Sequence, residues 1–424
     1  MREAFARAAY SVALRLLQPA YTLRLWLRGR AEPLYRERIG ERFGFYAEAP
    51  SAGWLWLHAV SLGETRAAAA LVDALRAERP GLRLLLTHGT ATGCDAGRAL
   101  LHDGDRQTWL PYDTPGAVQR FFAQFRPALG VLMETEVWPN LLLAARTARV
   151  PMVLANARLS EKSARRGRRF NAVLRPAIDS VALVLAQTEV DAQRIRQAGA
   201  RTVEVSGNLK YDLTPDSDQL AQGAAWQALV TRGVVLAAIT REGEEAMLLD
   251  AWQRTPRGDA LLVIVPRHPQ RFDEIAALVR AAGFSIARRS AWQGTPPADA
   301  LQAQVWLGDS MREMALYYAA AQVALLGGSF APLGGHNLIE AAACGCPLVM
   351  GPSTFNFSEA AELSLAAGAS LRAEDMHAAV ALALQLLHAR DRRRELSTNA
   401  LRFASQHRGA AQRMARRIAP MMAS

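Results

Sequence analysis

Carboxylates follow two of the predicted buried strands of this chain. Glu64 ends the segment HAVSLGE, and Glu134 and Glu136 lie in METEVWPN, directly after a short apolar run. Ligands of open α/β sheets bind at the carboxyl ends of the strands, where a carboxylate could take a proton from an attacking hydroxyl group. A helix N-terminus also favours a carboxylate, because it stabilises negative charge. Both interpretations stay open for Glu64, and Glu134 ranks above Glu136 because it comes directly off its strand.

Two basic residues also follow predicted strands. Lys210 lies in GNLKYD, and Arg267 lies in PRHPQRF, where Pro266 and Pro269 stiffen the loop. A lysine at such a position suits a phosphate or carboxylate, and a planar guanidinium suits bidentate binding of a phosphate. Taken alone, a lysine at the position of Lys210 is more often an ordinary surface charge.

A glycine-rich segment spans residues 322–357. It begins with a short apolar run, residues 323–326, continues through two glycine pairs, and reaches Asn337 and Glu340 at capping-box spacing before a short helix over 338–344. Glycines allow a phosphate to approach the backbone, and the helix N-terminus offers free N–H groups. The pattern therefore predicts an anion site, in which Glu340 could accept hydrogen bonds from a ribose. A tight strand–helix turn that needs glycine for its own geometry is the alternative.

Short apolar strands alternate with helical segments along the rest of the chain, which predicts open parallel sheets. A polar, turn-rich stretch separates two such series and is typical of an interdomain linker. We expect an α/β protein with two doubly wound Rossmann-like domains that face a central cleft. The expected parts are a membrane-contacting segment (1–30), an N-terminal acceptor-binding domain (31–212), a linker (213–230) and a C-terminal nucleotide-binding domain with closing helices (231–424). The predicted strands cover residues 54–60, 82–87, 107–110, 129–133, 151–155, 181–186, 202–205, 234–239, 261–265, 284–287, 305–307, 323–326 and 348–350.

The N-terminal segment mixes aromatic and aliphatic residues with arginines. Tyr21 and Trp26 stand among leucines and Arg15, Arg24 and Arg28. A basic helix of this kind lies well in a membrane interface, with its arginines on anionic head groups. Packing on the first domain or an oligomer contact is the alternative. A basic run over residues 158–169 suggests a second contact with lipid phosphates or nucleic acid.

The composition of the 424 residues narrows the possible partners. The formal net charge is +11, which favours an anionic partner such as an acidic membrane face or an anionic substrate. The three cysteines suit small core residues in a reducing compartment, since they form no zinc set. The pair Asp103 and Asp105 resembles a metal-binding D-x-D, but a turn is the preferred interpretation. We expect no metal, no cofactor, no secretory signal and no membrane-spanning helix.

Six motifs in order resemble a known family. HAVSLGET, METEVWPNLL, ANARLS, GNLKYD, VPRHPQRF and GGHNLIEAA with PLVMGPSTFNF are similar to segments of the 3-deoxy-D-manno-oct-2-ulosonic acid (Kdo) transferases of Gram-negative bacteria. The resemblance covers nearly the whole chain and implies the GT-B fold. It also implies transfer of Kdo from CMP-Kdo to a lipid A precursor (lipid IVA), in lipopolysaccharide biosynthesis, on the cytoplasmic face of the inner membrane.

The resemblance also implies roles for individual residues. Glu64 would be the general base, and Glu134 and Lys210 would stabilise the transition state. The CMP part of the donor would be held by Pro266, Arg267, Met311, Arg312, Glu313, Leu338, Ile339, Glu340 and Ala341. The family inverts at the anomeric carbon in one displacement, which needs one base and no covalent nucleophile.

The chain departs from the family pattern at three of these places. Arg312 stands where glycine is common, and Leu338 stands where proline is common. Arg241 occupies a position where family members often have histidine, and it is not among the expected site residues. A UDP-sugar transferase or epimerase of the same architecture, and a nucleic-acid-binding protein, are the competing interpretations; the latter rests on net charge alone.

Overall fold

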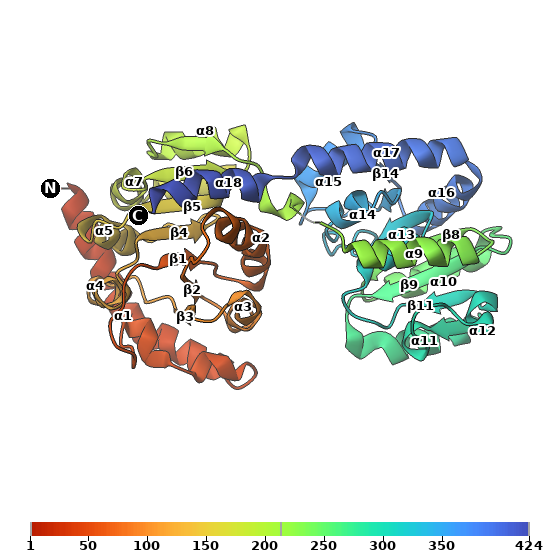
Figure 1. The fold of residues 1–424 in the computed structure, drawn as a ribbon, viewed down its shortest axis with the longest axis horizontal. Helices are drawn as coiled ribbons and strands as arrows, with labels where there is room; N and C mark the ends of the chain where they lie inside the picture. The colour runs from red at the N-terminus through yellow and green to blue at the C-terminus, as the bar shows by residue number, and fades with distance from the viewer. Residues whose placement is uncertain (1, 213, 423–424) are drawn as a thin grey trace. The chain divides into compact units, whose positions relative to one another are not determined.

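The computed structural model describes residues 2–212 and 214–422, apart from the side chains of Arg2 and His407. The backbone divides into two compact units (Figure 1). The first comprises Met1–Asp212 and Gly409–Ser424, and the second comprises Leu213–Arg408. The C-terminal segment therefore returns to the unit in which the chain begins.

The first unit is built around a sheet of seven parallel strands in the order β3-β2-β1-β4-β5-β6-β7. The order reverses between β1 and β4, which makes the carboxyl ends of these neighbours the expected ligand site. Its strands are β1 (Leu55–His58), β2 (Leu84–His88), β3 (Arg106–Trp109), β4 (Leu129–Met133), β5 (Met152–Ala157), β6 (Leu183–Ala186) and β7 (Val203–Val205). Its helices are α1 (Arg2–Arg28), α2 (Leu62–Glu78), α3 (Ala91–Gly97), α4 (Pro115–Phe125), α5 (Pro139–Thr147), α6 (Glu161–Arg168), α7 (Asn171–Asp179), α8 (Glu189–Ala198) and α18 (Ala410–Ile418).

Alternation along the strands of the first unit sends side chains to two cores. Leu55 and Leu57 of β1 pack on one face with α2 and α18, whereas Trp54 and Trp56 pack on the other with α4 and α5. Successive strand residues point to opposite faces, and both faces are covered by helices. This explains why the strands are continuous apolar runs.

The second unit repeats this plan with another sheet of seven parallel strands, in the order β10-β11-β9-β8-β12-β13-β14. Its strands are β8 (Val234–Thr240), β9 (Leu261–Pro266), β10 (Ile286–Arg288), β11 (Val305–Leu307), β12 (Val323–Leu326), β13 (Leu348–Met350) and β14 (Ser370–Arg372). Its helices are α9 (Ser217–Leu229), α10 (Glu244–Arg254), α11 (Phe272–Ala281), α12 (Ala298–Gln302), α13 (Met314–Ala320), α14 (Ile339–Ala343), α15 (Ser358–Ala366), α16 (Met376–His388) and α17 (Arg390–His407).

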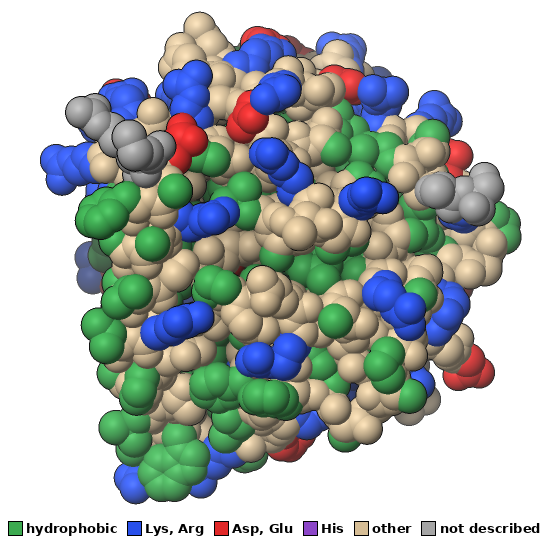
Figure 2. All heavy atoms as spheres, turned by 90° about the vertical axis from the view of Figure 1, so that its left-hand side faces the viewer, with side chains coloured by type: hydrophobic (Ala, Val, Ile, Leu, Met, Phe, Trp, Pro, Cys, Tyr) green, Lys and Arg blue, Asp and Glu red, His purple; other side chains and the backbone are tan. Residues whose placement is uncertain are grey.

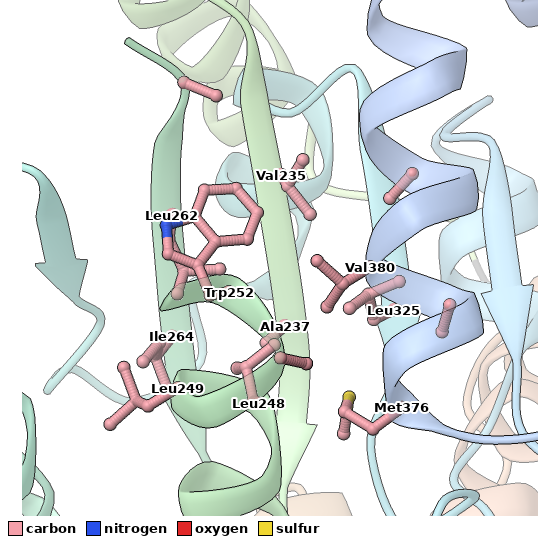
Figure 3. Close-up of a cluster of buried hydrophobic side chains, with 14 of the residues drawn as sticks. Val235, Ala237, Leu248, Leu249, Trp252, Leu262, Ile264, Leu325, Met376 and Val380 are labelled. Carbon is pink, nitrogen blue, oxygen red and sulfur yellow. The ribbon is translucent and has the colours of Figure 1, made fainter. Parts of the chain in front are cut away.

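The core of the second unit centres on Trp252. Its ring, from α10, lies over Val235 and Leu262 of β8 and β9, and α16 brings Val380 into the same cluster (Figure 3). Burying an indole of this size contributes about 2–3 kcal/mol relative to leaving it exposed. This packing holds the strands whose carboxyl ends carry the expected nucleotide-binding loops.

The expected linker forms a helix instead. Most of residues 213–230 belongs to α9, which packs against α13 within the second unit. Trp226 is buried, and Gly223 lies so close to α13 that a Cβ there would come within 2.3 Å of the Leu316 carbonyl oxygen. The exposed polar residues Asp216, Ser217 and Asp218 gather at the start of this helix, where Asp216 is the N-cap, and this is why the stretch resembled a linker.

The expected C-terminal boundary also differs from the structure. Residues 231–424 were assigned to one domain, yet α18 lies in the first unit, where Met414 and Ile418 are fully buried beside α2. The carboxylate of Asp212 accepts hydrogen bonds from the N–H groups of Gly409 and Ala411. These bonds hold the start of α18 beside the point where the chain leaves the first unit.

Candidate active site

Glu64 lies in the first turn of α2, just beyond the carboxyl end of β1. Its Oε2 accepts the N–H of Val60 at 2.7 Å, and its Oε1 accepts the hydroxyl of Ser61 at 3.0 Å. Ser61 Oγ in turn accepts the N–H of Glu64 at 3.5 Å, so Ser61 is the N-cap of α2 and Glu64 holds the residue that precedes the cap. Glu64 therefore has the helix-stabilising role that the sequence left open. It also lies at the carboxyl end of β1, where ligands of such sheets are expected.

The neighbours of Glu64 are the other two expected catalytic residues. Burial raises the pKa of Glu64, and the charge of Glu134 adds to this rise. The N–H of Val60, the Ser61 hydroxyl and the charge of Lys210 lower the pKa and oppose the effect. The fold thus gathers Glu64, Glu134 and Lys210 in one electrostatic neighbourhood of the first unit.

Glu134 is held in an unusual backbone conformation. Its φ is 57°, in the left-handed region, and its N–H donates to the carbonyl oxygen of Ala155 at 2.9 Å. A non-glycine residue there costs about 1–2 kcal/mol, and such strain is often found at functional sites. The conformation turns the chain sharply as it leaves β4.

Glu136 belongs to the same group, although the sequence ranked it below Glu134. The Trp138 indole N–H donates to its carboxylate at 2.8 Å. Burial, and then the charges of Glu64 and Glu134, raise the pKa of Glu136 to about 7. The sequence indicates Glu136 by the spacing METE, because side chains two residues apart can lie on the same side of an extended loop.

Lys210 is positioned by two asparagines, of which one is buried. It lies in a 3-10 turn, Leu209–Tyr211, where Asn208 Oδ1 accepts the N–H of Lys210 at 3.0 Å. Asn156, with φ 53° and no exposed surface, accepts the N–H of Leu209 at 3.0 Å. The segments ANARLS and GNLKYD therefore meet, and they bring the lysine from the edge strand β7 toward Glu64.

A cluster of cationic and imidazole side chains forms at the strand ends of the second unit. Arg241 follows β8, Arg267 and His268 follow β9, and His336 lies in the glycine-rich segment. Burial, and then the charges of Arg267, Arg241 and His268, lower the pKa of His336 to about 4. The cluster suits an anion; Arg241 and His336 were not among the expected site residues, because their convergence depends on the folded sheet.

The first half of the glycine-rich segment is occupied by an internal carboxylate. Glu244, which has no exposed surface, accepts the N–H groups of Gly328 at 2.6 Å, Phe330 at 3.0 Å and Arg241 at 2.9 Å. Backbone N–H groups of a glycine loop favour an anion. In this loop the anion is the Glu244 carboxylate of the protein itself. We therefore expect a ligand phosphate at the second half of the segment.

The second half of the segment differs from the expected helix start. Asn337 Oδ1 accepts the N–H of Ile339 at 3.1 Å, and α14 begins at Ile339. Within the described residues, no hydrogen bond returns from Glu340 to Asn337, so the expected capping box does not form. Because α14 begins at Ile339, Leu338 is its N-cap, which leaves Asn337 one position too early for that box. Burial raises the pKa of Glu340.

Two of the expected CMP-binding residues line one cavity. Arg312 and Glu340 border a space of about 280 Å³, together with Asp216 and Gln219 at the start of α9. The φ of Arg312 is 65°, a backbone conformation that favours glycine. Glycine is the residue that the family pattern has at this position. Gln219 Nε2 donates to the Arg312 carbonyl oxygen at 2.8 Å.

The remaining expected CMP-binding residues occupy mixed positions. Pro266 ends β9 and is buried, Met311 is exposed, and Glu313 pairs with Arg289 at 2.8 Å. Leu338, Ile339 and Ala341 are almost fully buried in the second unit. Side chain and backbone are both buried in these three residues, so they offer a ligand almost no surface.

Asp105 of the D-x-D sequence has a structural role. Asp105 accepts the N–H groups of Leu84 and His102, each at 2.8 Å, and pairs with Arg76. It fixes the turn before β3, at the amino edge of the sheet. Across residues 2–212 and 214–422, no three His, Cys, Asp or Glu side chains are grouped so as to hold a metal ion.

Helix α1 packs along the first unit by one face only. Tyr10 donates to Asp113 at 2.9 Å, and Leu25 is buried against Tyr35. Other large apolar side chains of α1 are exposed, including Leu16 and Trp26. The side of the molecule drawn in Figure 2 shows hydrophobic and basic side chains interspersed, with few acidic ones. None of the described helices combines the length and the apolar character needed to cross a membrane.

Comparisons with known proteins identify the family. Residues 37–213 match the family model described as 3-deoxy-D-manno-octulosonic-acid transferase (kdotransferase). A 3-deoxy-D-manno-octulosonic acid transferase of Bordetella pertussis is 49% identical, over 96% of this chain and 97% of the relative. The protein of the same name from Haemophilus influenzae is 33% identical, over 98% of this chain and 99% of the relative.

Solved structures support the fold class. The structure of Anabaena Alr3699/HepE in complex with UDP matches 88% of this chain and 98% of its own, with a TM-score of 0.54 and 17% identity. At that identity the match shows the fold alone, which is the GT-B class of two Rossmann-like domains. The extent and identity of the sequence matches show that the chain belongs to the 3-deoxy-D-manno-octulosonic acid transferases, glycosyltransferases of lipopolysaccharide biosynthesis.

Proposed function

We propose that this enzyme transfers Kdo from CMP-Kdo to a hydroxyl group of a lipid A precursor (lipid IVA) by an inverting displacement that needs no metal. The observation that carries this proposal is the shared neighbourhood of Glu64, Glu134 and Lys210. The acceptor oxygen attacks the anomeric carbon while Glu64 takes the hydroxyl proton. The bond from that carbon to the phosphate oxygen breaks, and CMP leaves with the electron pair.

The donor nucleotide binds in the second unit on this proposal. The cluster of Arg241, Arg267, His268 and His336 supplies positive charge for the single phosphate of a CMP-sugar. The cavity beside Glu340 and Arg312 receives the nucleoside, with the Glu340 carboxylate accepting from ribose hydroxyls. The other expected residues are Pro266, Met311, Glu313, Leu338, Ile339 and Ala341, and the buried ones among them support this site from within the second unit.

The acceptor is met at an anionic membrane surface. Exposed Leu16, Leu23 and Trp26 of α1 enter the interface, while Arg15 and Arg24 contact lipid phosphates. The enzyme is then a peripheral or monotopic protein on the cytoplasmic side of the inner membrane. Nucleic acid has no part in this proposal.

Product analysis tests the proposed reaction. The enzyme is incubated with CMP-Kdo and lipid IVA with and without EDTA, and mass spectrometry of the lipid follows the addition of Kdo. We expect the same product in both samples. Titration calorimetry then compares CMP with UDP, and tighter binding of UDP would contradict the assignment of the donor.

A further inference from the structure

A cavity of about 500 Å³ lies in the first unit beside the loop that carries Glu134 and Glu136. It is bordered by α6, α7 and α8, and by Thr135 and Val137 of that loop. Its volume falls within the range of about 300–1,000 Å³ that is typical of ligand pockets. None of the roles described above uses it.

The loop after β4 separates this cavity from the candidate catalytic residues. Glu134 and Glu136 interact electrostatically with Glu64, whereas Thr135 and Val137 line the cavity. Alternate residues of this short loop thus interact with Glu64 and line the cavity. A ligand held in the cavity would lie next to the loop that carries two of the candidate catalytic carboxylates.

The walls of the cavity are apolar and its rim is basic. The apolar lining includes Leu154, Leu159, Leu174, Ile178 and Ile195.

Three arginines also line the cavity. Arg194 donates to the Leu159 carbonyl oxygen at 3.3 Å. Arg168 and Arg175 are exposed, and in the described part of the chain their side chains make no hydrogen bond and no ion pair. Charge and polarity therefore complement a ligand that carries both a hydrocarbon chain and an anionic group.

We propose that this cavity binds one acyl chain of the glycolipid acceptor, and that Arg168 and Arg175 bind an acceptor phosphate. This rests on the proposed function, in which the acceptor is a phosphorylated glycolipid. A nucleotide would leave the apolar walls unmatched, whereas an acyl chain fills them and places the polar head at the loop carrying Glu134. A larger cavity of about 670 Å³ beneath α1 is lined by no residue of that loop, so it lacks this relation to the candidate catalytic residues.

Filling the cavity tests the binding of the acyl chain. Ala164 of α6 lines the cavity, whereas Ala172 of α7 is exposed and does not. Ala164→Phe is expected to raise the KM for the acylated acceptor at least tenfold, while the KM for CMP-Kdo and for a deacylated acceptor stays unchanged. Ala172→Phe is the matched control and should behave as the wild type. An unchanged KM for the acylated acceptor in Ala164→Phe would overturn the proposal.

A binding measurement separates this proposal from the proposed reaction. Dansylaminoundecanoic acid should fluoresce more strongly with the full-length wild type and with Ala172→Phe than with Ala164→Phe. Equal enhancement by all three proteins would place the probe elsewhere and contradict the cavity assignment. Absence of any Kdo transfer by the wild type would instead contradict the proposed function, whatever the probe shows.

The arginines are tested as a pair. Arg168→Ala with Arg175→Ala should raise the KM for the phosphorylated acceptor about tenfold and weaken its dependence on salt concentration. Arg165→Ala with Arg169→Ala removes the same charge from residues that do not line the cavity, and it should have a much smaller effect. Equal effects of the two pairs would show general attraction to the lipid surface and overturn the phosphate site.

Discussion

The carboxylate of Glu64 accepts the backbone N–H of Val60 at 2.7 Å, so the candidate base is fixed by a bond that ties the loop after β1 to the first turn of α2. Hydrogen bonds to a carboxylate lower its pKa, and burial raises it. The balance leaves a base that is oriented by backbone rather than by a mobile side chain. Such orientation is a recognised contribution to catalysis, because the group needs little reorganisation when the substrate arrives.

Glu64→Gln is expected to lower kcat by about 10²–10⁴-fold, since the amide cannot take the acceptor proton. The glutamine oxygen still accepts the N–H of Val60, so the free energy of unfolding should change little. Glu64→Ala also removes the acceptor of the Val60 N–H and of the Ser61 hydroxyl, and should cost about 1 kcal/mol of stability. Kdo transfer and urea denaturation measure the two effects, and near-normal transfer by Glu64→Gln would exclude it as the base.

Glu136 should make stability depend on pH. Its pKa is about 7 in the folded protein and 4.5 ordinarily. Between these values the folded state binds more protons than the unfolded state, so this residue's stabilising contribution is lost as the pH rises from about 4.5 to 7. The loss is on the order of 2–3 kcal/mol. Urea denaturation of the wild type and Glu136→Gln at pH 5 and pH 8 measures it, and an identical pH dependence in both would contradict the prediction.

Arg267→Ala should weaken the binding of CMP about 10–100-fold, because a charge-assisted hydrogen bond to the phosphate contributes about 1.5–3 kcal/mol. Titration calorimetry gives the affinity directly. Arg280→Ala removes an exposed arginine of α11 in the same unit and serves as the control. If both variants bind CMP equally well, Arg267 is not a phosphate ligand.

Arg312→Gly should raise the free energy of unfolding by up to about 1 kcal/mol, because glycine adopts the left-handed conformation without the steric cost that Arg312 bears. The affinity for CMP should be nearly unchanged, since the expected contact is through the backbone. Arg312→Ala retains the strained dihedral and is the control. A loss of stability in Arg312→Gly would show that the arginine side chain contributes more than its conformation costs.

The sequence was most informative where burial alone decides the structure. β4, β11, β12 and β13 have the predicted bounds, because strands covered on both faces must be short, continuous apolar runs. β14 was not predicted, since Ser370–Arg372 is a three-residue edge strand with one exposed end. Helix α18 was assigned to the wrong unit because its partner, α2, lies far away in the chain. Helix α9 was taken for a solvent-exposed linker because its contact with α13 cannot be seen in the sequence.

The candidate site divides in a similar way. Glu64, Glu134 and Lys210 could be named from motifs and lie together in the first unit. The contribution of Glu136 depends on burial and on neighbouring charges, which no local pattern contains. The convergence of Arg241 and His336 likewise depends on the order of strands in the second sheet.

The return of α18 to the first unit sets an order of events during synthesis. The second unit is a continuous stretch of chain and can fold as soon as it leaves the ribosome, whereas the core beside α2 stays open until the final helix is made. At about 5–20 residues per second, translation of Leu213–Arg408 delays that closure by roughly 10–40 s. During this interval the apolar surface that later receives Met414 and Ile418 is uncovered. The first unit is thus completed only after the second has been made, and during that time its core lacks Met414 and Ile418.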